Sequence, residues 1–249
     1  MTAYVTSDSE ALRRATGAGV RIAIIDSGVA VGHPHVGGVS GGTSLVGDDA
    51  NDVADRLGHG TAVLAAIHER APGAALVPVR VLDRRLATSA RILARAIEWA
   101  VDDGAQLVNL SLGTLNAEHV PLFRASLDVA MERGVIVVSA REHEGALWYP
   151  GSMDGALGVV ASMGAPRHGV GVSGTPSGRV VEASPYPRPV AGVPVERNLS
   201  GVSFAVANAT GLLALALEAG APRNSTQALL AWIAERAADC GAAPSSVPE

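Results

Sequence analysis

The apolar stretch Ala75-Leu-Val-Pro-Val-Arg-Val-Leu-Asp83 is followed by an amphipathic segment at residues 89–103 and a second apolar stretch, Gln106-Leu-Val-Asn-Leu-Ser-Leu-Gly113. Valine and leucine dominate both stretches, which is typical of buried strands. The segment between them repeats its apolar residues at helical spacing, on a face formed by Ile92, Leu93, Ala96, Ile97 and Ala100. A strand, a helix and a second strand in this order predict two parallel strands joined by a crossover helix.

The same alternation continues on both sides of this unit. Further strands are predicted at residues 20–25 and 135–139, and further helices at residues 8–16, 59–67, 121–133, 211–218 and 225–238. A stretch rich in Gly, Pro and Ser, residues 161–198, is predicted to be a long loop with a short strand at residues 179–182. The pattern predicts a three-layer α/β fold, with a mostly parallel sheet and helices on both faces.

The composition narrows the class of protein. No linker or internal repeat divides the 249 residues, so we expect one domain over residues 1–249, with a disordered tail at residues 241–249. The formal net charge is -5 and no long basic run occurs, which argues against a nucleic-acid partner. The N-terminus lacks signal-peptide features and no apolar run is long enough to span a membrane, so we expect a cytoplasmic protein if Met1 is the natural start. The oligomeric state cannot be inferred from these features.

Asp26 follows the strand predicted at residues 20–25 and is itself followed by Ser27 and Gly28. The carboxyl edge of a parallel sheet is where α/β proteins carry their chemistry, so Asp26 is a candidate site residue. The alternative is an Asx-turn that closes the strand.

His59 opens a predicted helix, and Ser203 lies in a predicted loop that leads to the helix at residues 211–218. His59 stands between Gly58 and Gly60, with bare backbone on both sides, and Ser203 follows Gly201 by two residues. Taken singly, each has a simpler explanation, because lone histidines usually have no catalytic role and serine is a common helix cap.

An acid, a histidine and a serine at the edge of one sheet together supply the groups needed for acyl transfer. A serine hydroxyl is too weakly acidic to attack unaided, the imidazole removes its proton, and the carboxylate orients and stabilises the imidazolium. Asp26, His59 and Ser203 are therefore predicted to form a catalytic triad.

At these residues the sequence resembles the subtilisin-like serine peptidases, over about residues 20–217. The stretch Asp26-Ser-Gly28 followed by His33-Pro34 is similar to the family's aspartate motif, and Gly58-His-Gly-Thr-Ala-Val63 to its histidine motif. Its serine motif, Gly-Thr-Ser-Met-Ala, is similar to Gly201-Val-Ser-Phe-Ala205. The resemblance implies a subtilisin-like fold, an Asp/His/Ser triad and an acyl-enzyme, and it implies that Ser111, Leu112 and Gly113 pair with the substrate backbone.

The sequence departs from the family around the oxyanion hole. The usual Ala-Gly-Asn-x-Gly segment is matched by Ala140-Arg-Glu-His-Glu-Gly145, which puts His143 at the position of the asparagine donor. The usual threonine before the serine is Val202, and the usual proline after the motif is Ala207. The resemblance then implies an oxyanion hole formed by the backbone N–H of Ser203 with His143 as a replacement donor.

These expectations favour a serine endopeptidase that hydrolyses peptides or proteins. The family's usual N-terminal pro-segment is not visible and no signal peptide precedes the domain, which favours a selective intracellular maturation protease for a precursor peptide. Two alternatives stay open at this point. One is a pseudopeptidase that binds peptides with an impaired oxyanion hole, and the other is a peptide ligase or cyclase that passes the same acyl-enzyme to an amine.

No cofactor is expected. The acidic residues Asp48, Asp49, Asp52 and Asp55 offer oxygen ligands of the kind that calcium takes, but they lack an EF-hand spacing with its closing glutamate, and we favour a solvated loop. The histidines share no spacing that predicts a metal site.

Overall fold

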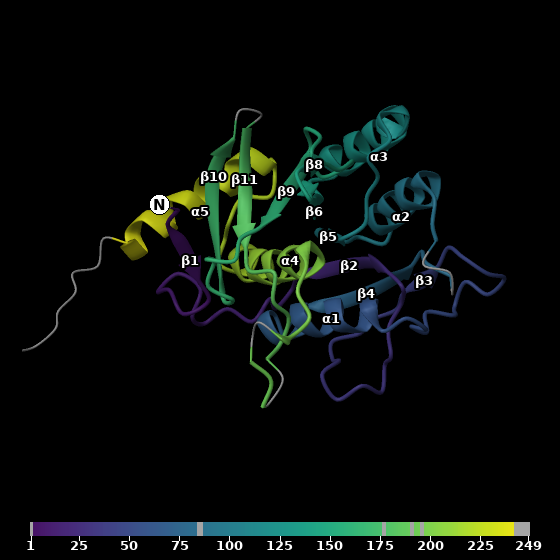
Figure 1. Cartoon of the computed structure of the whole chain (residues 1–249), viewed down its shortest axis with the longest axis horizontal. Coiled ribbons are helices and arrows are strands. Elements are labelled where there is room, and N and C mark those ends of the chain that lie inside the picture. The colour runs from purple at the N-terminus through teal and green to yellow at the C-terminus, as the bar shows by residue number, and fades with distance from the viewer. Residues whose placement is uncertain (1, 84–86, 176–177, 190–191, 195–196, 242–249) are drawn as a thin grey trace, which may run out of the picture.

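The computed structural model describes residues 2–83, 87–175, 178–189, 192–194 and 197–241. The predicted tail lies outside the described residues except for Gly241, which ends the last helix. Helices lie on both faces of a central sheet (Figure 1), and the predicted three-layer α/β fold is confirmed.

The strands are β1 (Tyr4–Thr6), β2 (Arg21–Asp26), β3 (Thr43–Ser44), β4 (Ala75–Arg80), β5 (Leu107–Leu110), β6 (Ile136–Ala140), β7 (Glu142–His143), β8 (Ala146–Leu147), β9 (Ala156–Ala161), β10 (Gly169–Thr175) and β11 (Gly178–Ala183). The helices are α1 (His59–Arg70), α2 (Ala90–Asp102), the short 3-10 helix η1 (Ala117–His119), α3 (Val120–Glu132), α4 (Val202–Glu218) and α5 (Thr226–Gly241). Among the described helices, none is both long and apolar enough to cross a membrane.

The described strands form a nine-stranded sheet in the order β1-β10-β11-β9-β6-β5-β2-β4-β3, with β7 and β8 paired separately. The pairings from β11 to β3 are all parallel, and only those of β1 with β10 and of β10 with β11 are antiparallel. Strand β2 lies between β4 and β5, so its last residue, Asp26, emerges at the carboxyl edge with a parallel strand on each side.

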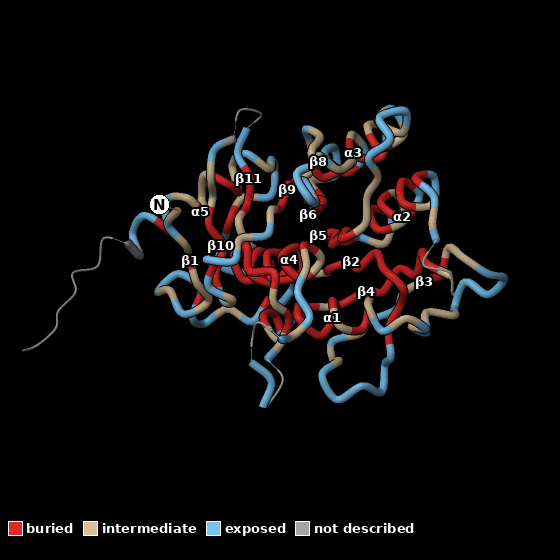
Figure 2. Tube along the Cα trace, in the orientation of Figure 1, coloured by how far each residue is buried: buried red, intermediate tan, exposed pale blue. Residues whose placement is uncertain are grey.

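Alternate side chains of the central strands supply two separate cores. Ile22 and Ile24 pack with the apolar residues of α1 and α4, whereas Ala23 and Ile25 pack with those of α2 and α3. The buried part of the tube in Figure 2 accordingly follows the central strands and the faces of the helices that cover them. Burial of β2 on both faces explains why the stretch before Asp26 is continuously apolar.

Two expectations about elements are wrong. Residues 8–16, predicted as a helix, form successive turns in which Leu12 N–H and Arg13 N–H both donate to Ser9 C=O. Residues 161–198, predicted as a long loop, contain the end of β9 and the antiparallel pair of β10 and β11. The short strand predicted within this range at residues 179–182 is confirmed as β11. Gly and Ser in β10 conceal this strand in the sequence because they pack little side-chain surface, and the pairing with β11 supplies its stability.

Candidate active site

Asp26 and His59 are in direct contact. Oδ1 of Asp26 lies 2.8 Å from Nδ1 of His59 and also accepts the backbone N–H of Ser27 at 2.8 Å. Asp26 is fully buried, whereas His59, the first residue of α1, is partly exposed. A buried carboxylate on Nδ1 fixes the orientation of the ring and leaves Nε2 as the nitrogen available to a reacting group.

The environment of His59 favours its protonated form. The hydrogen bond with Asp26 raises the pKa of His59 above its ordinary value, burial opposes this change, and the charges of Asp26 and Asp55 add to it. An imidazole whose cation is stabilised in this way is suited to accept a proton during a reaction.

The two glycines beside His59 have distinct structural roles. Gly58 precedes α1 with a positive φ of 82°, a conformation that glycine adopts at little cost. Gly60 lies against the backbone beyond β2, where a Cβ atom on Gly60 would be 2.3 Å from the carbonyl oxygen of Gly28. This close approach brings the first turn of α1 to the end of β2, and so His59 to Asp26.

We expect Gly60→Ala to lower the free energy of unfolding by about 1–3 kcal/mol, because the added methyl group would overlap the backbone of Gly28 and force it to move. Thermal unfolding measures the effect, and the matched control is Gly164→Ala, since a Cβ on Gly164 would meet nothing within 4 Å. Equal melting temperatures for the two variants would contradict the close packing of α1 on Gly28.

Asp55 organises the start of α1, a role that the sequence analysis missed. Its Oδ1 accepts from the Ser27 hydroxyl and from the N–H groups of Leu57 and Gly58, each at 2.9 Å. Its Oδ2 accepts from the N–H and hydroxyl of Thr61 at 2.8 and 2.6 Å. Burial opposes the change, but these donors outweigh it and hold the pKa of Asp55 below its ordinary value. An acidic residue shortly before a predicted helix was the available signal, because aspartate commonly satisfies the free N–H groups of a first turn.

Ser203 lies in the first turn of α4. The helix begins after Gly201 without a side-chain cap, and the next residue, Phe204, has its ring centroid 6.2 Å from that of His59. The first N–H groups of a helix have no partner within it, so the start of α4 presents backbone donors near Ser203. The ring contact brings the first turn of α4, which contains Ser203, next to His59 at the start of α1.

The predicted substrate-binding residues Ser111, Leu112 and Gly113 follow β5. The Ser111 hydroxyl donates to the backbone carbonyl of Ser203 at 3.4 Å, which ties this segment to the start of α4. Beyond it, Thr114 exchanges two backbone hydrogen bonds with Tyr149, at 3.0 and 2.9 Å. Ser111, Leu112 and Gly113 therefore connect the end of β5 to the bridge between Thr114 and Tyr149.

His143, the expected oxyanion donor, lies in β7, where its backbone pairs with Ala146. Glu144 and Gly145 both have positive φ angles, of 52° and 80°, which close a tight hairpin turn between β7 and β8. The side chain of His143 lies outside what the structure describes, so its role as a donor stays a prediction.

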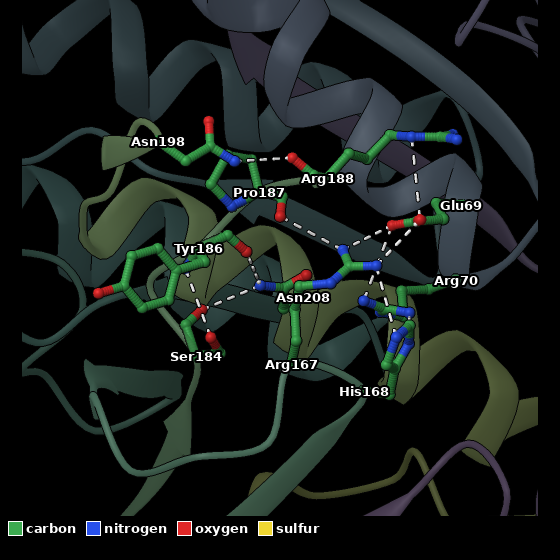
Figure 3. Close-up of polar contacts among 10 residues, drawn as sticks. All are labelled: Glu69, Arg70, Arg167, His168, Ser184, Tyr186, Pro187, Arg188, Asn198 and Asn208. Atoms are coloured by element: carbon green, nitrogen blue, oxygen red, sulfur yellow. Dashed lines mark hydrogen bonds and ion pairs between the residues drawn. The ribbon is translucent and has the colours of Figure 1, made fainter. Parts of the chain in front are cut away.

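A polar network holds the segment before α4, defined here as residues 184–189 and 197–201 (Figure 3). Asn208 of α4 donates to the carbonyl oxygens of Ser184 and Tyr186, both at 2.9 Å. Arg167 binds Glu69 through two hydrogen bonds of 2.7 and 3.0 Å and donates to Pro187 C=O at 3.3 Å. The segment before α4 is thereby held by hydrogen bonds to α4 and, through Arg167, to Glu69 of α1.

Glu69 is the centre of this network, because Arg70 and Arg188 also pair with it, at 3.7 and 3.8 Å. Burial opposes the change, but the three guanidinium groups hold the pKa of Glu69 below its ordinary value. Burial, together with the charge of Arg167, lowers the pKa of Arg70 to about 10, which leaves it charged at neutral pH.

We expect Glu69→Gln and Arg167→Gln each to lower the free energy of unfolding by about 1–3 kcal/mol, since each leaves a charged partner without its main hydrogen bonds. The double variant should lose less than the sum, with a coupling of about 0.5–3 kcal/mol in denaturant unfolding. Glu235→Gln is the control, because its contact with Arg236 is long and Glu235 is exposed. Additive losses would show that the pair does not act as a unit.

The candidate calcium ligands do not converge. Asp52 binds Arg56 and Arg80 at 2.7 and 3.0 Å, and Asp55 is occupied by the donors described above. Within the part of the chain that the structure describes, no group of three or more His, Cys, Asp or Glu side chains is arranged to hold a metal ion.

This fold and site belong to the α/β proteins that gather polar groups from strand ends and helix starts at the carboxyl edge of a parallel sheet. The model of the subtilase family of peptidases matches residues 17–178, and the chain belongs to that family. The resemblance inferred from the sequence is therefore confirmed. The matched range contains Asp26 and His59 and ends before Ser203.

Individual relatives agree with this assignment. The chain is 30% identical over 222 residues to a thermostable alkaline protease of Halalkalibacterium halodurans, which covers 80% of this chain and 57% of the relative. It is 33% identical over 140 residues to a subtilisin of Bacillus pumilus, covering 53% of this chain and 50% of the relative. The chain thus spans about half the length of these curated relatives.

Two solved structures have a similar fold. The Prenylagaramide maturation protease PagA superposes with a TM-score of 0.62 at 26% identity, covering 84% of this chain and 78% of that one. A lanthipeptide protease superposes with a TM-score of 0.60 at 19% identity, covering 79% and 73% of the two chains, a likeness of fold alone.

Proposed function

We propose that this chain is a serine endopeptidase that hydrolyses peptide bonds through Asp26, His59 and Ser203. The observation that carries the proposal is the 2.8 Å contact between the buried carboxylate of Asp26 and Nδ1 of His59, beside the first turn of α4. In this mechanism Nε2 of His59 takes the proton from the Ser203 hydroxyl as the oxygen attacks the carbonyl carbon. The same proton then passes to the leaving amine, and water hydrolyses the acyl-enzyme by the reverse proton route.

The start of α4 supports charge stabilisation during the attack. A helix N-terminus without a side-chain cap presents N–H groups and a partial positive charge, and Ser203 belongs to its first turn. We assign the backbone N–H of Ser203 as one oxyanion donor and His143 as the second. The hydroxyl of Ser111 is directed to the Ser203 carbonyl, which supports Ser111, Leu112 and Gly113 as the segment along which the acyl part of the peptide lies.

The substrate is proposed to be a precursor peptide that the enzyme cuts selectively. This part rests on the likeness to a maturation protease of 26% identity. Hydrolysis of many unrelated peptides without preference would overturn the selectivity and leave the peptidase in place.

A fluorophosphonate probe tests the chemistry directly, because it reacts with a serine activated by its base. Labelling of the wild-type chain that is lost in Ser203→Ala is the expected result. Absence of labelling in the wild-type chain would favour a peptide-binding pseudopeptidase. Mass spectrometry of the reaction products separates hydrolysed peptides from joined ones, and joined products would favour a ligase or cyclase.

A further inference from the structure

A second carboxylate lies beside the candidate triad and has no part in the proposed chemistry. Asp55 stands four residues before His59, and its two oxygens accept hydrogen bonds from residues on both sides of that histidine. Oδ1 accepts from the N–H groups of Leu57 and Gly58, and Oδ2 accepts from the N–H and the hydroxyl of Thr61. One side chain therefore holds the backbone that carries His59 from both directions.

Ser27 connects Asp55 to the acid of the candidate triad. The hydroxyl of Ser27 donates to Oδ1 of Asp55 at 2.9 Å, and its backbone N–H donates to Oδ1 of Asp26 at 2.8 Å. The same hydroxyl accepts the N–H of Gly60, the residue after His59, at 2.8 Å. Ser27, Asp26 and Gly60 are buried, which shields the bonds among them from water. Asp55, the end of β2 and the first turn of α1 thus form one hydrogen-bonded unit.

The residues beside His59 give the start of α1 little stiffness of their own. Gly58 and Gly60 flank the histidine, and glycine leaves the backbone more conformational freedom than any other residue. Gly58 precedes the helix without a side-chain cap. The N–H groups of Gly60 and Thr61, which have no partner within the helix, bind side-chain oxygens from outside it instead. A shift of this backbone would displace the imidazole that it carries.

Asp55 also acts on His59 through its charge. Burial opposes the change, but the donors outweigh it and hold the pKa of Asp55 below its ordinary value, so the group is a carboxylate where a histidine titrates. The hydrogen bond with Asp26 raises the pKa of His59, burial opposes this change, and the charges of Asp26 and Asp55 add to it. Phe204 faces the ring from α4 and carries no charge.

We propose that Asp55 is a positioning residue for the candidate base. Asp26 fixes the orientation of the imidazole, whereas Asp55 fixes the backbone from which it extends, so that Nε2 stays where it can take the proton of the Ser203 hydroxyl. Both oxygens of Asp55 are occupied by Ser27 and the start of α1, so Asp55 acts through His59 and not on the substrate. The inference rests on the proposed function for the role of His59 as the base, although the geometry itself needs no catalysis.

Asp55→Asn is the first test. The amide keeps the size of the side chain, but its nitrogen accepts no hydrogen bond and the negative charge is gone. We expect kcat to fall by about 10- to 100-fold, since misplacement of a reacting group by about 1 Å can cost about a hundredfold. KM should change by less than about threefold, because the lost interaction does not touch the bound peptide. The midpoint of kcat/KM against pH should move to lower pH, and by less than in Asp26→Asn, since the bond with Asp26 is the main cause of the raised pKa.

Two further variants separate this role from a general loss of stability. Asp55→Glu keeps the charge, but its longer side chain cannot repeat the same bonds, so kcat should fall while the pH midpoint stays near that of the wild-type chain. Asp103→Asn is the matched control, because Asp103 accepts from Arg21 Nε at 2.8 Å at the opposite end of β2, and it should change neither quantity. All rates are measured at a temperature at which each variant is folded. Wild-type kcat and an unchanged midpoint in Asp55→Asn would overturn the proposal and leave the peptidase in place.

Nuclear magnetic resonance tests the geometry without catalysis. The imidazole of His59 is titrated, and the Nδ1 proton shared with Asp26 is observed, in Ser203→Ala and in Ser203→Ala with Asp55→Asn. We expect a lower midpoint and faster exchange of this proton with water in the double variant. Identical spectra would overturn the proposal even in a chain that cleaves no peptide.

Thr61→Val takes the place of Asp55→Asn if that variant does not fold, because it removes a single donor from the same carboxylate. It should speed the exchange of the Nδ1 proton of His59 and lower kcat by about threefold or more. Wild-type values of both quantities in this variant would equally contradict the positioning role.

Discussion

Ser203→Ala is expected to lower kcat by about 10^6-fold, the size of the loss known for removal of the serine in subtilisin itself. Without the hydroxyl no acyl-enzyme forms, and His59 has no proton to accept. The rate is measured on a peptide that the wild-type chain cleaves, with product formation followed over hours to detect residual turnover. Binding of the same peptide should persist, because the change removes one oxygen atom.

The fold of this variant provides the control. Ser203 is only partly buried and its backbone continues α4, so we expect a melting temperature close to that of the wild-type chain. A variant that keeps its melting temperature and retains full activity would show that Ser203 is not the nucleophile. Loss of activity together with unfolding would instead call for Ser203→Gly or Ser203→Cys, compared at a temperature where both variants are folded.

Asp26→Asn is expected to lower kcat by about 10^4-fold, the loss known for the corresponding change in a chymotrypsin-type triad. The amide can donate to Nδ1 of His59, which favours the neutral tautomer that carries its proton on Nε2. In that tautomer Nε2 cannot accept the proton of the Ser203 hydroxyl. Labelling by the fluorophosphonate probe should slow in parallel. Asp52→Asn is a control, because Asp52 binds Arg56 and Arg80 away from the triad.

The pH dependence of kcat/KM tests the contact between Asp26 and His59 in a second way. The reaction needs neutral His59, so kcat/KM should rise with pH through the pKa of His59, which the bond with Asp26 holds above the ordinary value of 6.5. In Asp26→Asn the midpoint of the residual activity should move to lower pH because the negative charge is gone. An unchanged midpoint would contradict the assignment of His59 as the base held by Asp26.

The titration of His59 changes the stability of the fold in the opposite direction to the activity. A histidine whose pKa is raised in the folded state stabilises the fold fully below its unfolded pKa. This contribution is lost as the pH rises through the folded pKa of His59. The activity of the wild-type chain should therefore increase over the same pH range in which it loses this part of its free energy of unfolding, and Asp26→Asn should lose less over that range.

The predicted architecture was correct where strands are long and continuously apolar. Strand β2 and the crossover from β4 through α2 to β5 lie within a few residues of their predicted positions. Strands that are buried on both faces of the sheet consist of continuous apolar runs, which are easy to recognise in the sequence. The prediction of strands failed at β10, because its glycines and serines do not form an apolar run. It also failed at residues 8–16, where helix-forming side chains form turns.

The residues of the candidate triad were predictable from the sequence, but the residues that hold them in place were not. Asp26 and His59 were identified from their positions beside glycines at predicted element ends, and the structure brings them into contact although they stand 33 positions apart. Asp55 was expected in a solvated loop. Its donors Leu57 and Gly58 are close in the chain, whereas those from Ser27 and Thr61 come within reach only when α1 has formed against the end of β2. The roles of Ser203 as nucleophile and of His143 as oxyanion donor stay predictions.

The sequence by itself determined the α/β class, the parallel centre of the sheet and the chain order of acid, histidine and serine. These features follow from apolar periodicity and from glycines at the ends of helices and strands, which can be recognised within short stretches of sequence. Only the tertiary structure decided the bond of Asp26 to His59 and the pairing of Glu69 with Arg167 across 98 positions. Those features depend on which distant side chains the folded sheet and its helices bring within a few ångströms of one another, which no short stretch of sequence specifies.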